Sequence, residues 1–348
     1  MSEQKALLIE SKQGRFVVSS IPKPALPPPG ELIVKVQATA LNPVDWKIQA
    51  YGIFYERYPA IVGSDVAGDV EEIGEGVVGF KKGDRVFLQG SFANEYGGFQ
   101  QYTRARADFV AHIPEQLSYS QAASIPLALA TAAIGLYVNQ PSGIGLNPLF
   151  DTSANYSGQA ALVIGGSTSV GQYAIQLLRY VKFGPIITYA SGRHSEYLKS
   201  LGATDCIDRN QVSLSELPEV VKKLTGGVLV KVVYDAISND SQFAGYEILA
   251  EDGGMVLTGE NKLQDKIDGT GSKKTVVRVF ASPFMPATQE FGKAMYKNLT
   301  KLVEDGNLVP NRVEDLPNGL LGIITGLERM KKDQVSGVKL VAYPQETS

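Results

Sequence analysis

A glycine-rich segment in the middle of the chain has the residue types and spacing of a phosphate-binding turn. Residues 160–171 read Ala-Ala-Leu-Val-Ile-Gly-Gly-Ser-Thr-Ser-Val-Gly, an apolar run that ends in a turn, and a helical pattern follows at once. A strand, a tight turn and a helix start in this order place a pyrophosphate at the N-terminus of a helix. The segment therefore predicts a dinucleotide site.

Individual residues of this turn have distinct expected roles. Gly166 allows a sharp turn and Gly171 lets the helix pack close to the strand, whereas Thr168 replaces the middle glycine of the G-x-G-x-x-G pattern. A small hydroxyl residue still permits close approach of the backbone and offers one more donor to phosphate. An ordinary strand-to-helix turn is the alternative interpretation of this degenerate motif. The cofactor-binding residues assigned here are Gly165, Gly166, Ser167, Thr168, Ser169, Val170 and Gly171.

A second group of polar residues follows about 20 positions beyond the turn, where NAD sites carry an acidic residue on the ribose hydroxyls. Counting from Gly171 reaches residues 190–194, Ala-Ser-Gly-Arg-His, which include no carboxylate. Ser191, Arg193 and His194 instead supply a hydroxyl donor, a bidentate cation and a second potential cation, which are the groups that a 2′-phosphate requires. The sequence therefore predicts NADPH, and a solvated loop with incidental charge is the alternative.

The elements around these residues alternate between strands and helices. After the first strand, apolar runs predict five more strands, at 185–190, 206–208, 229–235, 254–259 and 275–280. This alternation is typical of a parallel, doubly wound sheet, whose ligand lies at the carboxyl ends of the strands. Thr258 and Phe280 fall at such strand ends, and we include both in the cofactor site.

The first third and the end of the chain have another pattern. Short runs such as 31–38 and 84–88 are separated by proline and glycine turns, which predicts a small β-barrel or sandwich. The last stretch adds helical patterns and a final strand at 337–342. Residues 140–159, just before the glycine-rich segment, form a long stretch rich in Pro, Gly, Ser and Asn, and loops of this length are often functional or disordered.

Composition limits the class of protein. The chain has 348 residues and a net charge of −3, which allows two domains with cores of their own and argues against nucleic acid as a partner. Its one cysteine, Cys206, excludes an internal disulfide and fits a reducing compartment. The first residues lack an apolar signal core, and no apolar run is expected to approach the roughly 20 residues of a membrane helix. We therefore expect a cytoplasmic protein that does not interact with membranes.

Several segments spread along nearly the whole chain carry a family resemblance, namely 40–47, 59–68, 83–86, 98–102, 122–126, 131–132, the glycine-rich turn and 336–340. They resemble motifs of the medium-chain dehydrogenase/reductase superfamily. The resemblance is closer to its zinc-independent branch of quinone oxidoreductases and enoyl reductases. Residues 45–47, 165–168 and 310–340 are most similar to fungal reductases, among them the trans-acting enoyl reductases that work beside polyketide synthases.

The resemblance implies an α/β protein of two domains. Both chain ends, residues 1–120 and 285–348, would form a GroES-like, β-rich catalytic domain. The inserted residues 121–284 would form a Rossmann domain with a doubly wound parallel sheet that binds NADPH, and the substrate would enter a cleft between the domains. Lys47 and Thr131 fall where residues of the family approach the nicotinamide and its ribose, so we assign both as catalytic and cofactor-contacting residues. The alternatives are a surface lysine and a helix-capping threonine.

The ligand inventory predicts no metal site. Catalytic zinc needs three protein ligands, mostly Cys and His, and structural zinc needs four, whereas this chain has one Cys and two His. Where the zinc branch of the family carries its first cysteine, this chain has Asp45. Where that branch has Gly-His-Glu, this chain has Gly-Ser-Asp at 63–65. His112 is expected to be a strand residue, and Cys206 is expected to be a small buried one.

Reduction of an activated C=C bond is the expected chemistry, because alcohol oxidation without zinc lacks its usual Lewis acid. The conjugated carbonyl of an enone, enal or enoyl thioester delocalises the charge that develops as hydride reaches the β-carbon. The site then has to hold the nicotinamide against the alkene and donate hydrogen bonds to the enolate oxygen. Candidates for an apolar pocket, each also a candidate core residue, are Tyr51, Tyr55, Phe99, Phe280 and Phe284.

Other functions remain open at this point. One alternative is a quinone or aldehyde reductase. Another is a trans-acting enoyl reductase that docks on a carrier protein of a polyketide synthase, although the sequence has no strong basic patch for an acidic carrier. A third is a non-catalytic NADPH sensor. The natural substrate, the stereochemistry, the proton donor and the choice between monomer and dimer are left open by the sequence.

Overall fold

The computed structural model describes residues 2–268 and 271–348, which form two compact units. Unit 1 comprises residues 2–127, 296–304 and 310–348, and unit 2 comprises residues 128–295 and 305–309. The sequence expectation had placed the boundaries at 120/121 and 284/285. Unit 1 therefore contains both ends of the chain, and most of unit 2 is one continuous insertion.

Unit 1 is built on two β-sheets. The smaller sheet has the order β2-β1-β4, and the larger has the order β15-β16-β3-β5-β6-β8, with β7 also paired to β3. All pairs are antiparallel except β15 and β16. The strands are β1 (Glu3–Ile9), β2 (Phe16–Pro22), β3 (Glu31–Ala40), β4 (Ala60–Ile61), β5 (Asp65–Ile73), β6 (Arg85–Gln89), β7 (Tyr102–Arg106), β8 (Val110–His112), β15 (Val313–Asp315) and β16 (Lys339–Ala342).

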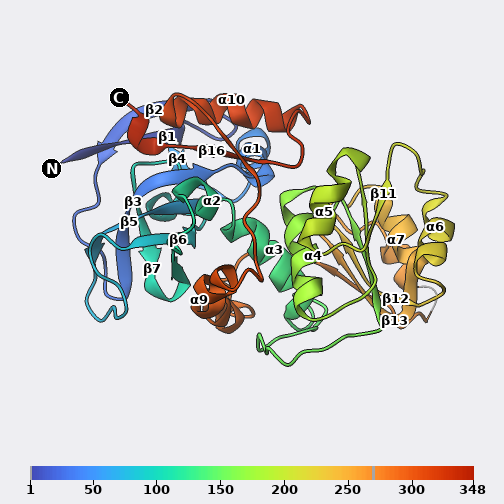
Figure 1. Ribbon diagram of the computed structural model, residues 1–348. Coiled ribbons are helices and arrows are strands. Elements are labelled where there is room, and N and C mark those ends of the chain that lie inside the picture. Colours follow the sequence, from blue (N-terminus) through green and yellow to red (C-terminus); the bar gives the residue numbers. More distant parts are fainter. Residues whose placement is uncertain (1, 269–270) are drawn as a thin grey trace. The chain divides into compact units, whose positions relative to one another are not determined.

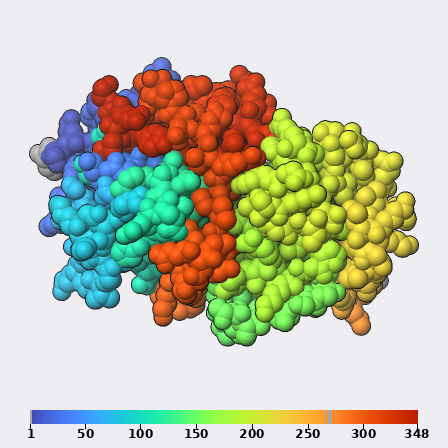
Figure 2. All heavy atoms as spheres, in the orientation of Figure 1, coloured from blue at the N-terminus to red at the C-terminus, as the bar shows by residue number. Residues whose placement is uncertain are grey.

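The helices of unit 1 bring the two chain ends together. Helix α10 (Gly319–Lys331) packs on α1 (Pro43–Tyr51) and against β1, β2 and β16, so the red C-terminal segment lies on the blue N-terminal strands in Figures 1 and 2. Leu7, Leu41, Ile48 and Leu327 fill the core between these elements. The other helices are α2 (Tyr119–Ala123), the second half of α9 (Gln289–Glu304), and the short turns η1 (Asn94–Tyr96), η2 (Ala107–Phe109) and η4 (Pro344–Glu346).

Unit 2 contains a six-stranded sheet of order β11-β10-β9-β12-β13-β14, in which every pair is parallel. This order confirms the predicted doubly wound sheet, and the direction of winding reverses between β9 and β12. Ligands of such sheets bind where the winding reverses, at the carboxyl ends of the strands. The strands are β9 (Ala160–Ile164), β10 (Ile186–Ala190), β11 (Asp205–Asp208), β12 (Val230–Asp235), β13 (Leu249–Leu257) and β14 (Thr275–Arg278).

Helices cover both faces of this sheet. Helix α4 packs on β9 and β10, and α7 packs on β12 and β13; Figure 1 shows α4 and α5 on one side of the sheet and α6 and α7 on the other. Because both faces are covered, β9 and β10 are buried throughout and do not alternate between apolar and solvent-facing residues. The helices are α3 (Pro126–Tyr137), α4 (Ser169–Tyr180), η3 (Gly192–His194), α5 (Ser195–Leu201), α6 (Leu217–Leu224), α7 (Ser241–Ile248) and α8 (Gln264–Asp268).

Some elements differ from the sequence expectation. Strand β13 begins at Leu249 instead of residue 254, because its first residues pair with β12 across an irregular register. Strand β14 ends at Arg278, which leaves Phe280 beyond the strand. Residues 139–158 contain no helix or strand, but Phe150 is buried against the rings of Tyr137, Tyr180 and Phe291. The long segment before β9 is therefore anchored to the core of unit 2.

One apolar stretch was missed. Residues Tyr119–Tyr137 are long and apolar enough by composition to cross a membrane, so the expectation that no run approaches this length was wrong. In the structure 83% of the apolar window is buried inside the protein, as in the core helices of globular proteins. The stretch is also divided into α2 and α3 at Ser124 and Ile125.

Candidate functional site

The glycine-rich turn joins β9 to α4 in unit 2. Gly165 has φ = 78°, a left-handed conformation that favours glycine. A Cβ atom on Gly166 would lie 1.8 Å from Oγ1 of Thr188 on β10, and one on Gly171 would lie 2.3 Å from the carbonyl oxygen of Gly165. No side chain fits at these positions, so the chain turns sharply and α4 begins directly against the end of β9.

The first turn of α4 has backbone donors available for an anion. Thr168 is the N-cap, and its Oγ1 accepts the N–H of Gly171 at 3.0 Å. The threonine hydroxyl is thus used to cap the helix, a role that the sequence analysis had not assigned to it. Among the described residues, no acceptor takes the N–H of Ser169 or Val170. Unpaired N–H groups at a helix N-terminus, together with the helix dipole, favour a phosphate.

Two polar residues that the sequence analysis missed, one buried and one half-buried, hold this turn in shape. Gln172 is fully buried on α4, and its Nε2 donates to the carbonyl oxygen of Ser167 at 3.0 Å. Tyr197 on α5 donates its hydroxyl to Oε1 of Gln172 at 3.0 Å. The sequence signal for this role was a glutamine on an otherwise apolar face of the helix. A buried amide needs partners for both its oxygen and its nitrogen, so Gln172 had to bond to groups nearby.

The turn after β12 forms the other side of the point where the winding reverses. The N–H of Ala236 donates to the carbonyl oxygen of Ile164 at 3.0 Å, which joins the ends of β9 and β12. Ile237 follows with 41% of its surface exposed, and a Cβ on Gly165 would lie 2.7 Å from its Cγ1. Thr258, assigned to the cofactor site from sequence, lies at this turn too, since its N–H donates to Oγ of Ser238 at 2.9 Å.

Asp235 determines the shape of this second turn. Its Oδ1 accepts the N–H groups of Ile237 and Ser238 at 3.0 and 2.8 Å, and its Oδ2 accepts the hydroxyl of Ser241 at 2.7 Å. Burial raises the pKa of the Asp235 carboxyl, and these hydrogen bonds partly oppose the rise. Asp235 is the last residue of the strand predicted at 229–235. A carboxylate at the end of a buried strand was the sequence signal that could have identified Asp235 as a residue that shapes the turn.

The residues expected at the 2′-phosphate form a compact loop after β10. Ser191 precedes η3, and its carbonyl oxygen accepts the N–H of His194 at 3.0 Å. Arg193 is exposed, whereas His194 is buried. Residues 190–194 contain no carboxylate, but Asp208 lies next to them. It ends β11 and pairs in register with Ala190 at the end of β10. A neighbouring strand thus brings a carboxylate to the loop that has none in its own sequence.

The remaining assigned residues are divided between the units. Lys47 is exposed on α1 of unit 1, with its ammonium 5.7 Å from the ring centre of Trp46. Thr131 is partly buried within α3 in unit 2, where its carbonyl oxygen accepts the hydroxyl of Tyr234 at 3.0 Å. It does not cap the helix. Phe280 follows β14 in unit 2 and is 45% exposed.

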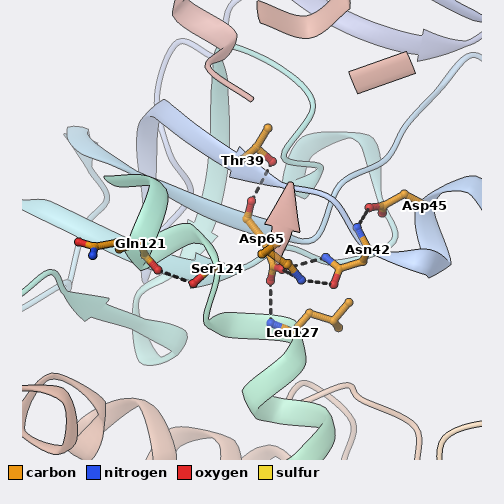
Figure 3. Close-up of polar contacts among 8 residues, drawn as sticks. Thr39, Asn42, Asp45, Asp65, Gln121, Ser124 and Leu127 are labelled. Atoms are coloured by element: carbon orange, nitrogen blue, oxygen red, sulfur yellow. Dashed lines mark hydrogen bonds and ion pairs between the residues drawn. The ribbon is translucent and has the colours of Figure 1, made fainter. Parts of the chain in front are cut away.

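Unit 1 contains a buried cluster of charged and polar side chains, drawn in Figure 3. Asp65 at the start of β5 is fully buried, and its Oδ2 lies 2.9 Å from Nζ of Lys339 on β16 and accepts Nδ2 of Asn42 at 2.8 Å. Its Oδ1 accepts the N–H of Leu127, in the first turn of α3, at 2.6 Å. The same Lys339 ammonium donates to Oδ1 of Asn42. Asp65 therefore connects β5, β16, the start of α1 and the start of α3.

Asp45 lies at the edge of this cluster. Its Oδ2 accepts the N–H of Asn42 at 2.7 Å, which caps α1, while Oδ1 has no hydrogen-bond partner among the described residues. Burial raises the pKa of Asp45 to about 7; the Asn42 hydrogen bond, the Lys339 charge and the Gly63 amide oppose that rise, and the Asp65 charge adds to it. A carboxyl with one unpartnered oxygen is stabilised by protonation, so Asp45 titrates near neutral pH.

The positions where the zinc branch of the family carries ligands lie in or beside this cluster. Asp45 and Ser64 stand where the zinc branch carries ligands, and both are buried. The described residues contain no group of three or more His, Cys, Asp or Glu side chains arranged to hold a metal ion. The cation next to Asp65 is the Lys339 ammonium. The donor set therefore does not fit zinc.

The expected pocket aromatics fall into two groups. Phe99 is fully buried, packed beneath Gly63, and Tyr55 is buried with its hydroxyl on the carbonyl oxygen of Ile61, so these two are core residues. Tyr51 is exposed at the end of α1, and Phe54 follows it, 47% exposed and stacked on Phe92 with 4.6 Å between ring centres. Sequence analysis did not select Phe54, whose positive φ of 68° is unusual for an aromatic residue.

Two family models match the chain. Residues 28–115 match the alcohol dehydrogenase GroES-like domain, and residues 169–298 match the zinc-binding dehydrogenase domain. A trans-enoyl reductase of Gibberella fujikuroi is 31% identical, with 98% of this chain and 99% of that protein covered. The trans-enoyl reductase RAP2 of Pyricularia oryzae is 30% identical, with 98% of each chain covered.

Solved structures of the same fold cover nearly the whole chain. An alcohol dehydrogenase superfamily protein from Novosphingobium aromaticivorans has a TM-score of 0.77 at 26% identity and covers 97% of this chain and 99% of its own. A quinone oxidoreductase from Coxiella burnetii has a TM-score of 0.73 at 24% identity, with 98% and 99% covered, and shares the fold.

Proposed function

This chain belongs to the medium-chain dehydrogenase/reductase superfamily, and we propose that it is an NADPH-dependent reductase of activated C=C bonds in enones, enals or enoyl thioesters. The observation that carries the proposal is the turn between β9 and α4, where no side chain fits at Gly166 or Gly171 and where no acceptor in the described part of the chain takes the N–H of Ser169 or Val170. The whole-length similarity to trans-enoyl reductases supports reduction of C=C bonds.

The residues of unit 2 suit a dinucleotide. The N-terminus of α4 would hold the pyrophosphate, with Gly166 and Gly171 allowing close approach of the backbone. Ser191 and Arg193 would bind the 2′-phosphate, and the exposed Ile237 offers an apolar contact beside Gly165. Thr258 and Phe280 would complete the site. We propose unit 2 as the cofactor domain and unit 1 as the catalytic domain.

When bound, the cofactor supplies the hydride. Lys47 and Thr131 would orient the nicotinamide ribose and carboxamide. The ammonium of Lys47 is exposed beside the ring of Trp46, so it can donate hydrogen bonds to the cofactor. On the α1 side of unit 1, Tyr51 and Phe54 present apolar surface within a few residues of Lys47. We propose that this surface contacts the apolar part of the substrate.

Zinc has no part in the proposed reaction. The Lys339 ammonium already neutralises Asp65, and protonation near neutral pH neutralises Asp45 without a metal. The similarity to trans-enoyl reductases also supports a polyketide synthase carrier as the source of the substrate. We further propose a cytoplasmic location, which the use of a single cysteine supports. Quinone or aldehyde reduction is the second candidate, favoured by the shared fold of the quinone oxidoreductase.

The test determines which carbon of the substrate receives the hydride. NADPH deuterated at C4 is incubated with the purified protein and a simple enone, or with an enoyl thioester of N-acetylcysteamine, and the product is analysed by NMR and mass spectrometry. Deuterium at the β-carbon of a saturated product is the expected result. Deuterium at a carbinol carbon with the alkene intact would identify a carbonyl reductase. NADH consumed faster than NADPH would contradict the choice of cofactor.

A further inference from the structure

The two basic residues of the loop after β10 contact each other. Nε of Arg193 donates to Nε2 of His194 at 3.3 Å. Arginine stays protonated at all ordinary pH values and has no acceptor atom, so Nε2 of His194 must be the acceptor. A histidine that accepts at Nε2 carries its proton on Nδ1 and is neutral. The expectation that His194 acts as a second cation for a phosphate is therefore not supported by this geometry.

The contact fixes which edge of the guanidinium is available. Bonding Nε to His194 leaves the edge formed by Nη1 and Nη2, and among the described residues neither of these nitrogens has a hydrogen bond or ion pair. His194 is buried, and Arg193 is exposed. The buried imidazole of His194 therefore holds the Arg193 guanidinium at Nε and leaves the Nη1–Nη2 edge for a ligand. Two parallel N–H groups on that edge match two oxygens of a phosphate.

The backbone of the same loop is held by a neighbouring strand. The Gly192 backbone lies against Asp208 of β11, since a Cβ on Gly192 would lie 2.5 Å from Oδ2 of Asp208. The N–H of Asn210 donates to Oδ1 of Asp208 at 3.0 Å, and the backbone amides of Asn210 and Gly192 lower the pKa of Asp208, so its carboxylate is charged at neutral pH. Asp208 thus positions the residue between Ser191 and Arg193 without using either of their side chains.

We propose that His194 and Asp208 are positioning residues that preorganise Arg193 for end-on, bidentate binding of the cofactor 2′-phosphate. The inference rests on the proposed NADPH site and specifies how that site distinguishes NADPH from NADH. His194 orients the guanidinium by accepting from Nε, and Asp208 fixes the backbone at Gly192. A preorganised arginine loses less conformational freedom on binding than a free one, so the two residues raise affinity for the phosphate without touching it.

Binding measurements without turnover test the proposal. Isothermal titration calorimetry of the full chain gives the Kd of NADPH, NADH, adenosine 2′,5′-bisphosphate and AMP. The variant Arg193→Ala sets the scale and is expected to weaken both 2′-phosphorylated ligands about tenfold to a hundredfold, with NADH and AMP unchanged. His194→Ala is expected to weaken the same two ligands about tenfold. His194→Gln restores an acceptor for Nε and should recover most of that loss.

Asp208 is tested with a matched pair. Asp208→Asn keeps an oxygen for the N–H of Gly192 and is expected to bind the 2′-phosphorylated ligands at least as tightly as the native protein. Asp208→Ala removes the acceptor and should weaken them selectively. Glu196→Ala, in the exposed ion pair with Lys199 on α5, is the control and should change no Kd.

The outcomes separate this inference from the proposed function. If the native protein binds none of the four ligands, the proposed cofactor site fails. If it binds NADPH but His194→Ala changes no affinity, or weakens NADH and AMP as much as their phosphorylated counterparts, the positioning role is wrong while the cofactor site stands. Failure of His194→Gln to recover binding would also overturn the role given to the Nε2 acceptor.

Discussion

The carboxylate of Asp65 and the ammonium of Lys339 form an ion pair inside unit 1, with 2.9 Å between Oδ2 and Nζ and side chains exposed by only 0% and 3%. The two residues begin β5 and β16, the strands on either side of β3. Neither group can regain water without disrupting the sheet. Each charge therefore depends on the other, and on Asn42, which bonds to both.

Removal of one partner should be costly. Lys339→Met is expected to lower the free energy of unfolding by about 3–5 kcal/mol, because it leaves the Asp65 carboxylate buried with no counter-ion. Urea denaturation monitored by circular dichroism measures the loss. Asp65→Asn combined with Lys339→Met should recover part of it. The exposed Lys332→Met is the control, and a Lys339→Met variant as stable as this control would contradict the prediction.

Asp45 should make stability depend on pH. Its pKa in the folded protein is about 7, against an ordinary value of 3.8 in the unfolded chain, so the folded state binds the extra proton. The stability due to this group is complete below about pH 4 and is lost as the pH rises through 7. Asp45→Asn keeps an oxygen for the Asn42 N–H and cannot ionise, so its stability relative to the native protein should increase from pH 5 to pH 8.

Denaturation midpoints of both proteins at pH 5, 6, 7 and 8 measure this dependence. The difference between the two isolates Asp45 from Asp235, whose pKa is also raised by burial. Asp45→Ala should be less stable than Asp45→Asn at every pH, since Asp45→Ala also loses the cap of α1. A difference between Asp45→Asn and the native protein that is constant across this range would show that Asp45 does not titrate there.

The contact between Gly166 and Thr188 should control cofactor binding. Gly166→Ala would place a methyl group 1.8 Å from Oγ1 of Thr188, which forces β10 and the turn apart. We expect loss of NADPH binding by calorimetry and a lower melting temperature. Adding Thr188→Ala removes the clashing hydroxyl, and binding should return in part. Gly184→Ala, at a glycine without a positive φ where a Cβ meets no atom within 4 Å, gives a glycine control in unit 2. Full binding by Gly166→Ala alone would be inconsistent with the structure.

Lys47 and Thr131 should affect turnover more than stability. Small displacements near a reacting centre reduce rates by about a hundredfold, so Lys47→Ala and Thr131→Val are each expected to lower kcat for an enone by one to two orders of magnitude. Lys47 is exposed, and Thr131→Val keeps the backbone carbonyl that accepts the hydroxyl of Tyr234, so the loss of kcat should exceed any loss of thermal stability. Lys81→Ala is the matched control. Unchanged kcat in both variants would remove these residues from the site.

Local patterns in the sequence determined the architecture of unit 2 and the position of its turn. Buried parallel strands are continuous apolar runs, and a strand followed by glycines and a helix is a local arrangement that neighbouring residues specify by themselves. The strand ends were less well placed, as at Leu249 and Arg278, since pairing partners decide them. The division of the catalytic domain between the two chain ends was inferred from the resemblance to family motifs, because no local pattern specifies it.

Only the tertiary structure decided which polar groups meet. Asp208 reaches Gly192 because β10 and β11 are paired in register, and Lys339 reaches Asp65 because β3 lies between their strands. The protonation state of His194 depends on which nitrogen faces Arg193, and the pKa of Asp45 depends on complete burial beside a second carboxylate. Charge, tautomer and hydrogen bonding are set by atoms within a few ångströms, and the fold brings those atoms together from distant parts of the chain.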